Sequence, residues 1–151
     1  MRKFAIFVVC IIAVAAIAYA LRPPSIPATI HIWQETDDAF WDHWKSLRRC
    51  IARALKGSNA DVMELISCAR YTEVSGAGFY GFGEVLLGVA REIGDSRFAE
   101  VCGKLPSDRV QVLLSLIQCG AEYGDPATSD EELHRQLPRT MEILDMAKHR
   151  E

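Results

Sequence analysis

From Asp37 to the C-terminus, apolar residues recur at the spacing of an α-helix, and glycine or proline interrupts the pattern at intervals. The first apolar face consists of Phe40, Trp44, Leu47, Ile51 and Leu55. One face of an amphipathic helix has this spacing, whereas a half-buried strand alternates every second residue. Because no convincing run of alternation appears, we predict an all-α fold with no sheet larger than one short hairpin.

Capping and breaking signals divide this region into about five to six helices. Glycine ends the first predicted helix at Gly57 and the third at Gly94, and Gly124–Pro126 ends the fifth. The second ends near Tyr71, and Pro138 should kink or break the last one. The predicted helix starts lie near Asp37, at Ser58 or Asn59, near Phe79, at Asp95 or Ser96, at Pro106 and Ser107, and at the capping box of Ser129 and Glu132.

The fifth predicted helix has apolar residues around most of its circumference, with a single polar stripe that includes Gln111, Gln118 and Glu122. Such a helix is usually the central one, so we predict that it is the most buried. The predicted core consists of Phe40, Trp44, Leu47, Ile51, Leu55, Leu65, Phe82, Leu86, Leu113, Leu114 and Ile117.

Three of the predicted helix ends share one pattern, which runs from alanine to glycine in Ala52–Gly57, Ala90–Gly94 and Ala121–Gly124. The alanines are 38 and 31 residues apart, in the range of helical-hairpin repeats. One capping rule acting at three helix ends produces the same pattern. The fold is therefore either an irregular bundle or a short stack of helical hairpins, and both bury the same faces.

An uncharged apolar run, residues 4–21, follows the basic start Met1–Lys3. As a helix this run would be about 27 Å long, close to the thickness of about 30 Å of a bilayer core. It fits an uncleaved signal-anchor, a predicted N-terminal apolar helix, and also a signal peptide cleaved after Ala20. Arg2 and Lys3 favour a cytoplasmic N-terminus, so the remainder is predicted to be periplasmic or extracellular, and secreted if cleavage occurs.

The chain thus divides into three parts. Residues 1–21 are the signal-anchor or signal peptide, and residues 22–36, with three prolines, are predicted to be an extended linker. Within the linker, Thr29–Trp33 alternates and forms either a short strand or a segment lying on the domain. Residues 37–151 are the helical domain, whose length suits one core.

The charge of the exported part argues against nucleic acid as a partner. Without Arg2 and Lys3 it keeps 15 of the 17 basic residues against 20 acidic ones, a net charge of −5. Binding to phosphates requires a basic surface. Cysteines at positions 50, 68, 102 and 119 permit two disulfides in an oxidising compartment, or are small buried apolar residues.

Motifs for catalysis, metals or cofactors do not rise above background. Gly76–Gly81 reads G-x-G-x-x-G, but no strand precedes it as a dinucleotide site requires. Gly81 and Gly88 are better explained as small residues on one side of a helix that let another helix approach. Glu131 and His134 are half of a di-iron motif whose other half is missing. We therefore expect no cofactor, no metal and no enzymatic activity.

The first predicted helix carries basic residues at helical spacing on an otherwise acidic domain. Arg and Trp are enriched in protein interfaces, which favours this face as a partner-binding surface. A solvated face whose cations stabilise the helix C-terminus explains the same pattern. The candidate partner-binding residues are Trp41, Lys45, Arg48, Arg49, Arg53 and Lys56.

These observations favour a non-enzymatic protein-binding module, membrane-anchored through residues 4–21 or exported, that binds a protein partner with an acidic surface. Lipid headgroups near the anchor are another ligand for the basic face. Small exported helical domains of this layout include immunity and adaptor proteins, an analogy of architecture alone. The alternative class is a small-molecule or lipid-binding helical domain of the cell envelope, with a cavity near Phe79, Tyr80 and Phe82.

Overall fold

The computed structural model describes residues 11, 12, 14, 23–41, 46–71, 76–124 and 127–148. These residues form eight α-helices and a 3₁₀ turn (Cys68–Tyr71), and none of them is in a strand. The helices are α2 (Gln34–Trp41), α3 (Leu47–Lys56), α4 (Asn59–Ser67), α5 (Gly76–Ile93), α6 (Asp95–Cys102), α7 (Ser107–Tyr123), α8 (Asp130–Gln136) and α9 (Pro138–Lys148). The prediction of an all-α bundle is confirmed.

The number of helices exceeds the predicted five to six because two predicted helices are divided. Ser46 has an extended backbone, with φ −98° and ψ 106°, and is the N-cap of α3, so α3 does not continue from α2. Trp44 and Lys45 lie outside the described residues. At the other end, Pro138 separates α8 from α9, as predicted.

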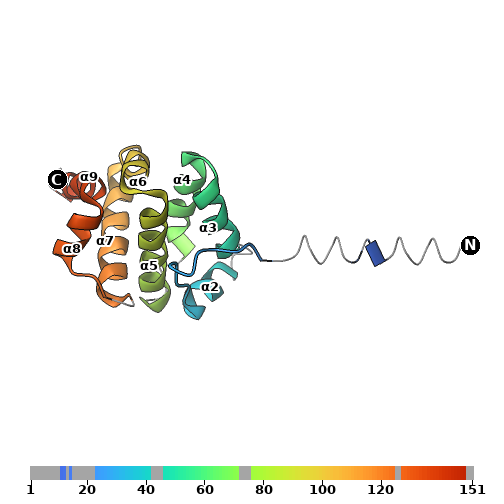
Figure 1. Ribbon diagram of the computed structural model, residues 1–151. Helices are drawn as coiled ribbons and strands as arrows, with labels where there is room; N and C mark the ends of the chain where they lie inside the picture. Colours follow the sequence, from blue (N-terminus) through green and yellow to red (C-terminus); the bar gives the residue numbers. More distant parts are fainter. Residues whose placement is uncertain are drawn as a thin grey trace, which may run out of the picture.

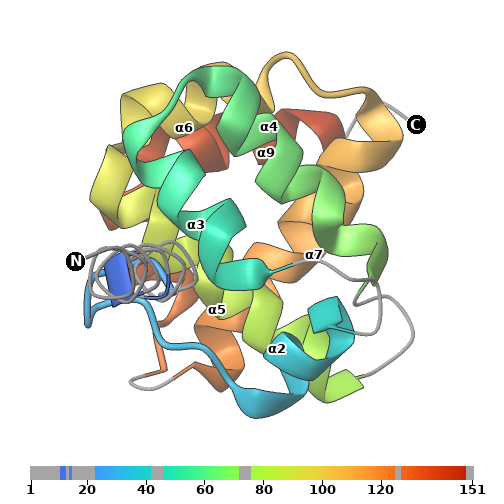
Figure 2. The same cartoon turned by 90° about the vertical axis from the view of Figure 1, so that its right-hand side faces the viewer.

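Helices α5 and α7 stand side by side in the centre of the bundle (Figure 1). Helices α8 and α9 cover α7 on one side, and α2, α3 and α4 lie on the other side of α5. Figure 2, turned by 90°, shows α3 and α4 in front of this central pair. Helix α7 is not the neighbour of α5 in sequence, and this pair supports most of the other helices, whereas α4 packs mainly against α3 and α6.

Glycine permits the close approach of α5 and α7. A Cβ atom on Gly83 would overlap the carbonyl oxygen of Leu116, and one on Gly120 would overlap the backbone of Gly83 and Glu84. Because backbone meets backbone here, no flexible side chain can move aside. Gly81 and Gly88 were both predicted to admit another helix. Gly81 does so, because it faces Thr36 of α2 as well as Trp33, whereas Gly88 faces Ile30 of the irregular N-terminal segment.

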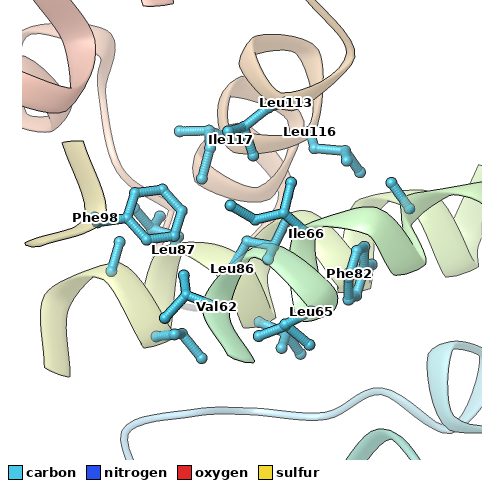
Figure 3. Packing of buried hydrophobic residues seen from close by; sticks show 14 of the residues in the cluster. Val62, Leu65, Ile66, Phe82, Leu86, Leu87, Phe98, Leu113, Leu116 and Ile117 are labelled. Atoms are coloured by element: carbon cyan, nitrogen blue, oxygen red, sulfur yellow. The ribbon is translucent and has the colours of Figure 1, made fainter. Parts of the chain in front are cut away.

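All eight described helices contribute buried side chains to the core, and those of α4, α5, α6 and α7 converge in Figure 3. Of the predicted core, Leu55 is only partly buried and Trp44 lies outside the described residues. Helix α5, rather than α7, has more buried positions, because α7 keeps a polar stripe with Gln111 and Glu122 exposed. The predicted core residues that are buried are Phe40, Leu47, Ile51, Leu65, Phe82, Leu86, Leu113, Leu114 and Ile117.

Residues 23–33 form an irregular segment lying on the domain, and the alternative of a strand is wrong for these residues. Ile30 is 4% exposed and packs against the helix at Gly88. The apolar run 4–21 lies outside the described residues except for positions 11, 12 and 14. Within the described part of the chain, every helix is too short or too polar to cross a membrane.

Two side chains of α6 form hydrogen bonds to the backbone at the ends of other helices. Asp95, predicted as a possible cap of its own helix, accepts hydrogen bonds of 2.9 Å from the backbone N–H groups of Arg139 and Thr140 and so caps α9. Gly94, with φ +87°, is the N-cap of α6 instead. Arg97 reaches the end of α3, where it donates to the carbonyl oxygen of Gly57 at 2.7 Å.

Candidate functional site

A groove of 530 Å³ lies along the outer face of α3, on the side where the N-terminal segment meets the domain. Pro24 forms one wall, and residues of α3 and the start of α4 form the remainder. Its lining residues are Pro24, Arg49, Ala52, Arg53, Lys56, Gly57 and Asp61, and we call it the α3 groove.

The α3 groove brings together three of the six candidate partner-binding residues: Arg49, Arg53 and Lys56. Their spacing of four and three residues places them on one side of the helix. Arg48 is half-buried and does not line the groove. Trp41, at the end of α2, is 73% exposed and also lies outside the groove lining.

Arg53 is held by carboxylates of α4. Its guanidinium lies 2.7 Å from Asp61 and 2.8 Å from Glu64. The hydrogen bond to Asp61 and the charge of Glu64 raise the pKa of Arg53 above its usual value. Hydrogen bonds from the backbone of Ser58 and from Arg53 lower the pKa of Asp61. Arg53 therefore contributes to the α3–α4 contact as well as to the groove.

Arg49 and Lys56 are different. Both are exposed, and within the described part of the chain neither forms an ion pair or a hydrogen bond to another side chain. Lys56 lies in the last turn of α3, where a cation also favours the helix dipole. The groove thus presents two available cations beside the apolar surface of Pro24 and Ala52. This arrangement suits a ligand segment with carboxylate or phosphate groups.

A second pocket, of 180 Å³, lies where the N-terminal segment crosses α5 near the end of α7. Three of its residues are aromatic and two are acidic. Its lining residues are Trp33, Glu35, Ala77, Tyr80, Gly81, Glu84 and Tyr123, and we call it the aromatic pocket. Sequence reasoning singled out Tyr80 but missed Trp33, Glu84 and Tyr123 as its neighbours, because positions 33, 84 and 123 share no local pattern.

Residues that line the aromatic pocket contact one another. Tyr80 and Tyr123 are stacked, with ring centroids 4.7 Å apart. The indole N–H of Trp33 donates a hydrogen bond to Glu84, and His31 lies 3.7 Å from the same carboxylate. Glu122 is the main cause that raises the pKa of the neighbouring Tyr123. Of the cavity residues predicted from sequence, Phe82 is fully buried in the core and Phe79 packs against it, so neither lines this pocket.

Other residues considered for chemistry have structural contacts. His134 bonds the carbonyl oxygen of Asp130 at 2.8 Å and the carboxylate of Asp145 at 2.9 Å, and so joins α8 to α9. Among the described residues, no three His, Cys, Asp or Glu side chains cluster as metal ligands. The four cysteines from position 50 onward are free thiols, and burial raises the pKa of Cys102 to about 12.

Comparison with known proteins gives no match to a family model, a curated protein or a solved structure. Any functional assignment therefore rests on the two sites described above.

Proposed function

We propose that this chain is a non-enzymatic binding module, held at the outer face of a membrane through residues 4–21, that docks an acidic segment of a protein partner in the α3 groove. The observation that carries the proposal is the pair of cations, Arg49 and Lys56, that line the groove without partners in the described residues. Exposed cations without internal partners contribute little to folding and remain available for steering and binding a charged ligand.

The shape of the groove favours a protein segment as its ligand, rather than a flat layer of lipid headgroups. The groove is hollowed between Pro24 and α3, and part of its floor is the apolar side chain of Ala52. Asp61 also lines it and would repel anionic headgroups, whereas a shaped peptide can place its acidic groups away from Asp61. Pro24 follows Leu21 by three residues, about 10 Å of chain at most, so the partner would bind close to the membrane.

Site-specific photo-crosslinking in the native cell envelope tests the proposal. A photoreactive residue replaces Ala52 in the full chain, and the matched control places it at Ser115, on the exposed stripe of α7. We expect a protein adduct from position 52 alone, with an acidic segment at the crosslink. A lipid adduct identified by mass spectrometry at position 52 would contradict the proposal and assign the groove to headgroups.

Charge reversal in the groove is a second test of the proposal, with the same crosslinking readout. The double variant R49E/K56E should abolish the adduct, because reversed charges repel an acidic segment. The control K104E/R109E changes the net charge equally, on exposed residues outside the groove, and should leave the adduct unchanged. The adduct should also weaken as salt rises, since exposed charges are screened over about 8–10 Å. Equal effects of the two double variants would exclude the groove as the docking site.

A further inference from the structure

The aromatic pocket combines aromatic rings with carboxylates, and it is separate from the α3 groove in its lining residues. The rings of Trp33, Tyr80 and Tyr123 border it. Aromatic faces carry negative potential and attract cations within about 6 Å of the ring centre. Glu35 and Glu84 add full negative charges to the same wall. Both features select a positively charged ligand over a neutral or anionic one.

The lining of the pocket contains two glutamates and no lysine or arginine, so the lining side chains together are acidic. Arg91 of α5 lies outside this lining and donates hydrogen bonds to Gln136 at 2.8 Å and to Thr128 at 3.1 Å, although the charge of Glu84 also acts on it. His31 lies within ion-pair distance of the carboxylate of Glu84, at 3.7 Å.

The walls favour a weakly hydrated cation. Ala77 and Gly81 offer no polar side-chain atom, and one oxygen of Glu84 already accepts the Trp33 indole hydrogen bond. A metal ion such as Ca²⁺ requires about six to eight oxygen ligands, which this wall does not supply. A quaternary ammonium group needs no hydrogen-bond acceptor, because its methyl groups contact ring faces directly. A volume of 180 Å³ is below the roughly 300–1,000 Å³ of pockets for drug-sized ligands, so the bound group is small.

We propose that the aromatic pocket binds a quaternary ammonium group. Two sources share this chemistry: a free organic cation such as choline, and the choline headgroup of a membrane lipid. In either case the cation lies against the aromatic rings, and Glu84 and Glu35 supply the opposing charge. This activity is independent of the α3 groove and of the protein partner proposed there.

Nuclear magnetic resonance of the Trp33 indole N–H tests the proposal on the full chain in maltoside micelles, with the signal assigned through Trp33→Phe. Choline should shift this signal saturably, whereas its uncharged isostere 3,3-dimethylbutanol should not. Equal shifts by both compounds, or none by choline, would overturn the proposal. Nanodiscs distinguish the sources: a shift caused by phosphatidylcholine in place of phosphatidylglycerol assigns the headgroup, and one caused only by free choline assigns the soluble cation.

Two variants with a matched control locate the site. Glu84→Gln keeps a hydrogen-bond acceptor for Trp33 but removes the charge, and Tyr123→Ala removes one ring. Each should weaken choline binding about fivefold or more, since a single cation–π or charge contact of about 1 kcal/mol corresponds to about fivefold. Glu92→Gln is the control, because Glu92 also lies on α5 and accepts a hydrogen bond from the N-terminal segment, through Thr29. Similar effects of Glu84→Gln and Glu92→Gln would overturn the proposal, provided thermal melts show both variants folded.

Discussion

The α5–α7 contact and the outer face of α3 are built from opposite kinds of residue. At the α5–α7 contact, Gly83 and Gly120 bring two backbones together with no side chain between them. On α3, the long side chains of Arg49 and Lys56 border an open groove. The first surface depends on shape and tolerates no added atom, whereas the second depends on charge. Mutations should therefore separate what holds the fold together from what binds a partner.

The largest effect is expected at the α5–α7 contact. Gly83→Ala or Gly120→Ala would drive a methyl group into the backbone of the facing helix, so the helices must separate. We expect a loss of about 3 kcal/mol or more in the free energy of unfolding, measured by urea denaturation. Gly103→Ala is the control, since the nearest atom to its added Cβ is 3.6 Å away and little change should follow. Equal stabilities of the Gly83 and Gly103 variants would mean that the helices are not in close contact.

Arg97 is a cation that belongs with the fold rather than with the basic groove. It is half-buried and donates hydrogen bonds to the carbonyl oxygens of Ala54 and Gly57 and to the side chain of Asn59. Arg97→Ala leaves the carbonyls at the end of α3 without this donor and should cost about 1–3 kcal/mol in thermal or urea unfolding. Arg109→Ala, at an exposed position, should stay within about 0.5 kcal/mol. If Arg97→Ala lost no more stability than Arg109→Ala, Arg97 would not be a residue that stabilises the fold.

A smaller, pH-dependent effect is expected at His134. The carbonyl oxygen of Asp130 and the carboxylate of Asp145 raise its pKa in the folded state. Protonated His134 therefore stabilises the fold fully below the unfolded pKa of about 6.5, and this stability is lost as pH rises through the folded pKa. The effect should be small, because the side chain is 42% exposed and water screens the pair. Melting temperatures of wild type and Asp145→Asn across pH 5–8, chosen to span about the usual His pKa, should differ in slope; identical slopes would contradict this role.

The smallest effect on stability is expected at the α3 groove itself. R49E/K56E should shift the melting temperature by no more than a few degrees, because exposed charges contribute about 0–1 kcal/mol each. Arg53→Glu should shift it further, since that change places a third carboxylate beside Asp61 and Glu64. Unfolding of the R49E/K56E variant would show that these cations stabilise the fold, as the α5–α7 contact does, and are not free for binding.

Local signals in the sequence predicted much of the fold. Ser58 caps α4 as predicted, and Pro138 separates two helices as expected. Of the capping box predicted at Ser129, the hydroxyl accepts from the backbone N–H of Glu132, but the carboxylate of Glu132 contacts Gln136 and Arg135. The break before α3 at Ser46 was missed, because the apolar spacing from Phe40 to Leu47 continues across it. The candidate site was predicted in part: the basic row was visible on one helix, but the carboxylates that pair with Arg53 come from another.

The helical character, most helix boundaries and the row of cations on α3 follow from local sequence, because periodicity and capping act over a few neighbouring residues. The contacts between residues far apart in the chain became apparent only in the folded domain. Asp95 caps α9 rather than its own helix, and Trp33, Tyr80 and Tyr123 border one pocket although they lie far apart in the chain. Such contacts depend on how helix surfaces fit together, and the glycine contact between α5 and α7 sets that fit for the centre of the molecule.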